Sequence, residues 1–209
     1  MAMRIYTNKT LIDVIVTCTE NVNGCKKVLA AANQRINIDV HDKKHVYILL
    51  EGKLDLYRIV DDILILSIEE PTVIGAMSVI DYRSFHYFKT STESVLLEMS
   101  GNTFIQIIDN NSLWKEMYFL VCDYAMEFFC RDTRFSSKNS YNIIKNNLEI
   151  IWGYPVGERS EISIFKFILS RSSISRSSLN KILKELCNGG YIKINRGRLI
   201  DMKNLPSKF

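Results

Sequence analysis

The hydrophobic pattern of this 209-residue chain changes its period at Gly101. Between about residues 35 and 100, apolar side chains alternate with polar ones, as Leu54 and Leu56 show, whereas after Gly101 they recur every three or four positions. A period of two is typical of a half-buried strand, and a period near 3.6 is typical of an amphipathic helix. We therefore expect an α+β protein with its strands in the first half and its helices in the second.

The first half is predicted to contain several short strands. Gly52, the pair Asp61–Asp62 and the segment "EEPTVIG" separate the alternating stretches, and "SVLLEMS" at 94–100 is a further strand candidate. Glycine, proline and aspartate are typical of turns. Because many short strands joined by turns favour an antiparallel roll or barrel, we expect residues 1–110 to form an N-terminal antiparallel β-roll.

The second half is predicted to be helical up to a domain boundary. "NTFIQIIDNN" predicts a short helix, residues 112–132 a long one, and "NSYNIIKNNLEIIW" at 139–152 another amphipathic helix. The segment "GYPVGER" at 153–159 contains glycine and proline, which are typical of linkers. We therefore expect residues 111–152 to form a long helix with a linker helix, and residues 153–209 to form a separate domain.

The long helix carries more apolar side chains than one buried face requires. Its main apolar stripe consists of Leu113, Met117, Leu120, Tyr124 and Phe128. The residues that widen this stripe are Trp114, Val121, Ala125 and Phe129. We predict that the main stripe is the interface of a homodimer. The alternative is a helix buried on both sides within one monomer, because a stripe in the sequence does not name its partner.

The last 50 residues predict a winged helix-turn-helix. "ISIFKFIL" reads as a helix with Phe165, Ile168 and Leu169 on one face, and a short turn leads to a second helix capped by Ser175. The second helix has an apolar stripe and ends at the pair Gly189–Gly190. "YIKI-NRG-RLIDM" then predicts two strands around a three-residue loop. The order helix, turn, helix, hairpin is that of a winged helix-turn-helix.

The charge of the chain is concentrated in this last domain. Residues 153–209 hold 11 Lys and Arg against 4 Asp and Glu, a net charge of +7, whereas residues 1–152 hold 16 against 19, a net charge of −3. Such a distribution favours a polyanionic partner, here double-stranded DNA. The alternative is a solvated basic face, which explains the charge but not the order of the elements.

The DNA contacts follow from the position of each residue in the motif. In a helix-turn-helix, the N-terminal residues of the second helix reach base edges in the major groove. The predicted base-reading residues are Arg176, Ser177, Asn180 and Lys181. We expect Lys184, one turn further on, to meet a phosphate, and the wing residues Arg196 and Arg198 to reach the flanking backbone or the minor groove.

Three segments carry a resemblance to a known family: "YILLEGKLDLYR", "ILSIEEPTVIGAMSVID" and "ISRSSLNKIL". Through them the chain resembles the cyclic-AMP receptor protein and fumarate–nitrate reduction regulator family over most of its length. From residue 112 to 209, "SLWKEM", "NSY", "ISRS" and "GRLIDMKNLPSKF" are similar to an enterobacterial branch of regulators. The resemblance implies a cyclic-nucleotide-binding-like roll, a long dimerisation helix and a sequence-specific transcriptional regulator connected with oxidative stress.

The nucleotide pocket departs from the family pattern. Ala76 stands where the cyclic-AMP binders have a glutamate for the ribose, and the pair Arg83–Ser84 comes several residues earlier than the arginine–serine pair of the family. A phosphate without its partner is poorly accommodated among apolar groups. We therefore expect a degenerate pocket and no binding of cyclic AMP. The residues expected to fill the pocket are Val73, Ile74, Val79, Ile80, Phe85 and Phe88.

The leading prediction is a regulator whose roll binds no effector, and two alternatives to it stay open. The roll could sense an unknown small molecule, with Tyr82 and Arg83 as candidate contacts. A thiol redox switch could instead use Cys18 with Cys25, but only if the N-terminal loop folds back. Cys122 and Cys130 lie about 12 Å apart along one helix, too far for a direct bond.

No cofactor, metal or catalytic signature is expected. The cysteines follow no C-x-x-C pattern, so neither a zinc site nor an iron–sulfur cluster is predicted. The histidines fall in no nucleophile or metal motif, and we expect His41 and His45 to be surface residues. No run approaches the ~18 apolar residues of a membrane span, and Asp13 interrupts the N-terminal apolar patch. We therefore expect a cytoplasmic protein that is not an enzyme.

Overall fold

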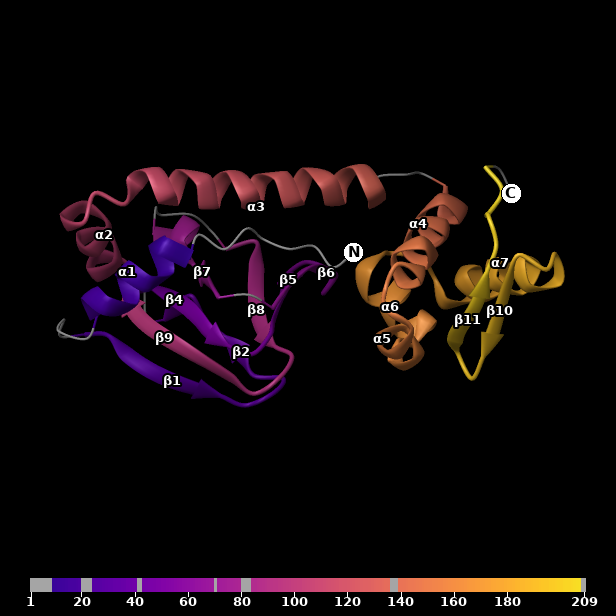
Figure 1. The fold of residues 1–209 in the computed structure, drawn as a ribbon, viewed down its shortest axis with the longest axis horizontal. Coiled ribbons are helices and arrows are strands. Elements are labelled where there is room, and N and C mark those ends of the chain that lie inside the picture. The colour runs from indigo at the N-terminus through magenta and orange to yellow at the C-terminus, as the bar shows by residue number, and fades with distance from the viewer. Residues whose placement is uncertain are drawn as a thin grey trace. The chain divides into compact units, whose positions relative to one another are not determined.

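A computed structural model describes residues 9–19, 24–40, 43–69, 71–79, 84–135 and 139–207 (Figure 1). The chain divides into two compact units, one from residue 3 to 128 and the other from 129 to 209. The two units are described separately.

The N-terminal unit is an antiparallel roll of two sheets with helices at its start and end. Its elements are α1 (Lys9–Thr19), β1 (Lys26–Ala30), β2 (Arg35–Ile36), β3 (Asp39–Val40), β4 (Lys43–Glu51), β5 (Leu54–Arg58), β6 (Leu64–Ile68), β7 (Thr72–Ile74), η1 (Ala76–Val79), β8 (His86–Thr90), β9 (Ser94–Ser100), α2 (Gly101–Asn110) and α3 (Trp114–Phe135). One sheet has the order β1-β9-β4-β3, with β7 also paired to β4, and the other has the order β2-β8-β5-β6. The predicted α+β class and the antiparallel roll are confirmed.

The alternation that the sequence predicted holds on β5 but not on β4, β6 or β7, where neighbouring residues are buried together. On β5, Leu54 and Leu56 are buried while Asp55 lies on the other face. On β4, by contrast, Val46 to Leu49 are all buried. Helix α2 and the short helix η1 both pack against this strand. The glycines at two turns are required by geometry: Gly52 has φ +100° and Gly75 has φ +84°, and an added Cβ would clash with backbone atoms at both positions.

Helix α1 is an element that the strand-and-helix pattern did not predict. Its sequence is rich in β-branched residues, which weaken the local preference for a helix. Leu11 and Ile15 nevertheless lie four residues apart and are completely buried in the core of the roll, while Asp13 lies exposed between them. Tertiary packing of one helical face therefore decides the structure of this segment.

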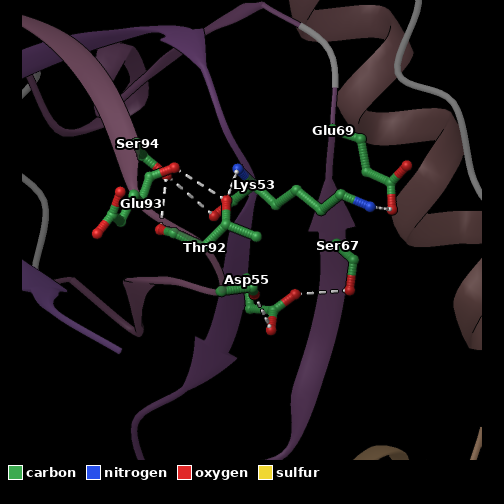
Figure 2. Close-up of polar contacts among 8 residues, drawn as sticks. Lys53, Asp55, Ser67, Glu69, Thr92, Glu93 and Ser94 are labelled. Atoms are coloured by element: carbon green, nitrogen blue, oxygen red, sulfur yellow. Dashed lines mark hydrogen bonds and ion pairs between the residues drawn. The ribbon is translucent and has the colours of Figure 1, made fainter. Parts of the chain in front are cut away.

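A polar network joins the turn between β8 and β9 to β5 and β6 (Figure 2). The Asp55 carboxylate accepts hydrogen bonds from Ser67 Oγ (2.7 Å) and Ser91 Oγ (2.6 Å). The Lys53 backbone N–H donates to Thr92 Oγ1 (3.0 Å), and the Lys53 ammonium pairs with Glu69 at 3.0 Å. These polar groups satisfy one another, so the network holds the turn in place.

In the described residues, the C-terminal unit contains two helices, α4 and α5, besides the two predicted for residues 153–209. Beyond the last turn of α3 its elements are α4 (Ser140–Trp152), α5 (Val156–Glu161), α6 (Ile164–Arg171), α7 (Arg176–Asn188), β10 (Ile192–Asn195) and β11 (Arg198–Met202). Ile144, Leu148 and Ile151 of α4 share one buried core with α6 and α7. The core of this unit therefore begins before the expected boundary at 153–159, and that segment itself contains α5.

The apolar stripe predicted as the dimer interface packs on the roll instead. Leu113, Met117 and Leu120 are buried in the core of the N-terminal unit, and Tyr124 and Phe128 pack against it. The Tyr124 hydroxyl donates to the Val73 carbonyl at 3.0 Å, and the Phe128 ring lies 5.8 Å from the His86 ring. The interface prediction is therefore corrected: these five side chains contact their own chain. The apolar residues of α3 that are exposed are Trp114, Tyr118, Phe119, Val121, Met126 and Phe129.

The cysteines and histidines were considered in the sequence as possible redox or metal-binding residues. All five cysteines are free thiols. Among the described residues, no helix has the length and apolar character that a membrane span requires, and no cluster of three His, Cys, Asp or Glu side chains could hold a metal. His45 differs from expectation, because it is partly buried on β4 with its Nδ1 2.9 Å from Glu98 Oε1. His41 lies outside the described residues.

Candidate nucleic-acid interface

Helix α7 begins at a side-chain cap, as its sequence predicted. Ser175 has an extended backbone, and its Oγ accepts a hydrogen bond from the Ser178 backbone N–H at 3.1 Å. The same oxygen lies 3.0 Å from Ser177 Oγ and 2.8 Å from Ser178 Oγ. This cap satisfies an otherwise unpaired amide and fixes where the first turn of α7 starts.

The two faces of α7 differ completely in character. Leu179, Leu183 and Leu186 are buried in the core of the C-terminal unit. The exposed side chains predicted to meet DNA are Arg176, Ser177, Asn180, Lys181 and Lys184. The structure therefore brings all five predicted residues of this helix together on one solvent-facing surface, which carries hydrogen-bond donors and positive charge.

Helix α6 and the turn that follows it precede α7 in the sequence, and α6 packs against α7. Ser163 caps α6, and the buried Ser172 hydroxyl donates to the Ile168 carbonyl at 2.7 Å where α6 ends. The buried residues of α6 are Ile164, Phe167 and Ile168. The predicted buried face of Phe165, Ile168 and Leu169 is thus rotated, and Phe165 is only partly buried.

The wing is tied to the helix-turn-helix by its own backbone. Arg196 (φ 46°) and Gly197 (φ 75°) form the tip between the paired strands β10 and β11. Two successive positive φ values are typical of a two-residue hairpin turn, one residue shorter than the loop that the sequence predicted. The Gly197 carbonyl accepts a hydrogen bond from the Ile164 N–H at 3.0 Å. The tip is therefore fixed against the first turn of α6.

The two arginines of the wing have different surroundings. Arg196 is exposed at the tip. Arg198 is half-buried, and its guanidinium donates to the Glu161 carbonyl at the end of α5. The sequence assigned both to DNA. The structure leaves Arg196 on the surface and gives Arg198 a contact within the domain, which joins the wing to α5.

An open hollow lies where α6 and α7 begin. It has a volume of ≈ 470 Å³ and is lined by Phe165, Arg176, Ser177 and Asn180. The Arg176 guanidinium carbon lies 5.5 Å from the centroid of the Phe165 ring, within reach of a cation–π interaction. The sequence pattern placed Phe165 on a face with Ile168 and did not predict its position at the surface. Its place directly after Ile164 could have indicated this position, because neighbouring residues of a helix point about 100° apart and Ile164 and Ile168 share the buried face.

The residues expected to fill the nucleotide pocket differ in burial. Val73, Ile74 and Phe88 are buried in the core of the N-terminal unit, and Val79 is partly buried. Phe85 is 68% exposed, so the expectation that it fills the pocket is wrong. The other residues named for this region, Ile80, Tyr82 and Arg83, lie outside the described residues.

A capped helix-turn-helix followed by a two-stranded wing defines a winged helix-turn-helix fold in the C-terminal unit. A model of winged helix-turn-helix DNA-binding domains matches residues 140–207, which span α4 to the end of the wing. The match begins at α4, in agreement with the place of this helix in the C-terminal core.

Solved structures similar to the whole chain are bacterial regulators. The c-di-GMP-responsive global regulator CLP of Xanthomonas campestris superposes with a TM-score of 0.72 at 12% identity, covering 94% of this chain and 100% of its own. A transcriptional regulator of the CRP/FNR family from Thermus thermophilus gives a TM-score of 0.56 at 16% identity, covering 84% and 94%. The resemblance to the cyclic-AMP receptor protein and fumarate–nitrate reduction regulator family is confirmed at the level of the fold.

Curated relatives are more similar in sequence. The "Inhibitor of hydrogen peroxide resistance" of Salmonella typhimurium is 29% identical over 167 residues, which is 79% of this chain and 80% of the relative. The protein of the same name from Escherichia coli K12 is 26% identical over 169 residues, covering 80% and 81%. The enterobacterial branch that the segments after residue 112 resemble is confirmed as this group of proteins.

Proposed function

We propose that this protein is a transcriptional regulator that binds double-stranded DNA in a sequence-specific manner. The observation that carries the proposal is the exposed face of α7, where Arg176, Ser177, Asn180 and Lys181 stand on a capped helix whose other face is buried. Arginine suits guanine, asparagine suits adenine, and serine suits either donors or acceptors on base edges. Lys184 lies further along the helix, where a phosphate contact positions the helix without reading sequence.

The wing supplies a second contact in this proposal. Arg196 is the exposed arginine at its tip, and the hydrogen bond between Gly197 and Ile164 fixes the tip relative to α6. A positive side chain held at a fixed distance from the recognition helix suits the backbone beside the major groove. Arg198 then contributes indirectly, because it joins the wing to α5 through the Glu161 carbonyl.

We propose that the regulator is a homodimer through the exposed face of α3. Tyr118 is 66% exposed and Phe129 is 67% exposed, and both lie on one long helix whose opposite face is buried. Exposed apolar side chains in a row are typical of a protein interface. A parallel pairing of two copies of α3 would bury them, and a two-fold axis there would present two recognition helices to half-sites about 34 Å apart.

We propose a connection with peroxide stress, which the name of the curated relatives, "Inhibitor of hydrogen peroxide resistance", supports. The thiol-switch alternative gains no support from the pKa values of Cys25 and Cys187. Burial raises the pKa of the Cys25 and Cys187 thiols, whereas redox-sensing cysteines have a lowered pKa. We propose that this regulator is not an enzyme, since the solved structures it resembles are regulators and the domain model it matches is one of DNA-binding domains.

The test of DNA recognition compares two substitutions on α7. The wild-type protein first selects duplexes from a random pool. Arg176→Ala should weaken binding to the selected duplex by about 1–3 kcal/mol and remove the preference at one base position. Lys184→Ala should weaken binding to all duplexes evenly. Equal affinity of wild type and Arg176→Ala for the selected duplex would reject the assignment.

The roll is proposed to be unable to use cyclic AMP. Ala76 offers no carboxylate for the ribose, and Val73, Ile74 and Phe88 are already buried among their own neighbours. A polar ligand without its partners would lose more hydrogen bonds with water than it regains. Calorimetry with millimolar cyclic AMP should give no binding heat. A micromolar dissociation constant would overturn this part and restore the small-molecule sensor.

A further inference from the structure

The hollow at the start of α7 contains one aromatic ring among polar groups. Phe165 comes from α6, and Arg176, Ser177 and Asn180 come from the first turns of α7. The three residues of α7 are exposed, whereas Phe165 is partly buried. A phenylalanine offers no hydrogen bond, so its place in this surface calls for an apolar partner.

The edge of a base pair in the major groove offers a single apolar group. That group is the 5-methyl of thymine, and contact with phenylalanine is one of the ways in which proteins read it. The other walls of the hollow suit neighbouring bases, since the Arg176 guanidinium can grip guanine and the Asn180 amide can grip adenine. One hollow thus combines a partner for a methyl group with partners for purine edges.

The contact between Phe165 and Arg176 also favours this arrangement. The guanidinium carbon lies 5.5 Å from the ring centroid, so cation–π attraction holds the arginine beside the ring before DNA binds. A long side chain that is already restrained loses less conformational entropy on binding. The ring and the guanidinium are therefore presented together, as a pair.

We propose that Phe165 is a specificity-determining residue that reads the 5-methyl group of a thymine adjacent to the guanine bound by Arg176. This inference rests on the proposed function, because it assigns a base to the same DNA-binding surface. Phe165 makes no hydrogen bond to the DNA, and its contribution is the removal of the methyl group from water.

The test uses the full-length protein and the duplex that it selects from a random pool. Each thymine is replaced in turn by deoxyuridine, which removes only the methyl group. At one thymine of each half-site, next to the guanine whose preference Arg176→Ala removes, the affinity should fall about four-fold, the value of one buried methyl group. The scan on the wild-type protein needs no folded variant.

Phe165→Ala then assigns the effect to the ring. This variant should bind the thymine and deoxyuridine duplexes equally, and circular dichroism checks that it is folded. Lys166→Ala is the matched control, because Lys166 is the exposed neighbour on the same helix and should keep the four-fold preference for thymine.

The outcomes separate this inference from the proposed function. If Arg176→Ala loses base preference while the deoxyuridine scan is flat, or if Phe165→Ala keeps the full preference for thymine, the role of Phe165 is wrong and sequence-specific binding stands. If the wild-type protein enriches no sequence from the pool, the proposed function fails, and the inference fails with it.

Discussion

Helices α3 and α7 are both amphipathic and both bury one face, but they expose opposite kinds of surface. The outer face of α7 carries Arg176, Lys181 and Lys184, whereas the outer face of α3 carries large apolar side chains such as Tyr118 and Phe129. A basic surface gains from a polyanion, and an exposed apolar surface gains from another apolar surface. The comparison teaches that the face a helix leaves exposed, and not the face it buries, indicates its partner.

The largest effect is expected on the outer face of α3. The double substitution Tyr118→Glu with Phe129→Glu places charges where two copies of the helix would meet, so it should give folded monomers. Affinity for the selected duplex should fall about 100-fold or more, because the second half-site is no longer bound at high effective concentration. Analytical ultracentrifugation and DNA titration measure the two effects.

Val60→Glu is the control for this experiment, since Val60 is also an exposed apolar residue but lies in the turn after β5. It should leave both the dimer and the DNA affinity unchanged. A wild-type protein that sediments as a monomer while it binds DNA would remove the contrast between the two helices.

The inner face of α3 should give a smaller and different effect. Leu120 is buried in the core of the N-terminal unit, so Leu120→Ala should lower the free energy of unfolding by about 2–5 kcal/mol. The folded variant should remain a dimer, because the side chain that is removed faces the roll. Urea unfolding followed by sedimentation at low urea checks both points.

Leu29→Ala is the matched substitution, because Leu29 lies on β1 and is exposed. It should change stability by less than about 0.5 kcal/mol.

Tyr124 and Phe128, the residues first assigned to the interface, also pack against the core of the N-terminal unit. A charge at either position is therefore expected to unfold this unit and not to release folded monomers. Folded monomers from Leu120→Ala would show that the inner and outer faces of α3 have been exchanged.

The contrast between α3 and α7 also explains which features could be predicted from the sequence. The cap, stripe and stop of α7 are local signals between Ser175 and Gly189, so its exposed face could be predicted residue by residue. The apolar residues of α3 surround the helix, so periodicity predicts burial but not which face meets the roll. The choice depends on contacts such as that of Tyr124 with Val73, 51 residues away in the sequence.

Other differences have the same physical origin. The Arg198 side chain bonds to a carbonyl 37 residues earlier, and no local pattern announces an acceptor on the backbone. Helix α1 has a strand-like composition, and only the burial of Leu11 and Ile15 in the roll makes it a helix. Phe165 looked like a core residue because its distance from Ile168 fits a helical stripe. Its place in the hollow depends on how α6 is rotated against α7.

The smallest effect is expected from the Tyr124 hydroxyl on the inner face of α3, and it depends on pH. Burial raises the pKa of Tyr124 to about 12, above its ordinary value of about 10. A tyrosine whose pKa is raised on folding stabilises the protein fully below pH 10, and this stabilisation is lost as pH rises through 12.

Tyr124→Phe keeps the ring but removes the titrating hydroxyl and its hydrogen bond to Val73. At neutral pH the variant should be less stable by about 0.5–1.5 kcal/mol, the value of one hydrogen bond. Between pH 10 and 12 this difference should shrink and then reverse, because Tyr124 ionises more readily in the unfolded wild type and two pKa units are worth ~2.7 kcal/mol, more than the hydrogen bond. The other tyrosines are present in both proteins and cancel in the difference. Urea unfolding at a series of pH values measures this reversal. A difference that stays constant up to pH 12 would mean that the Tyr124 hydroxyl is open to solvent, and the inner face of α3 would then be held to the roll by its apolar residues alone.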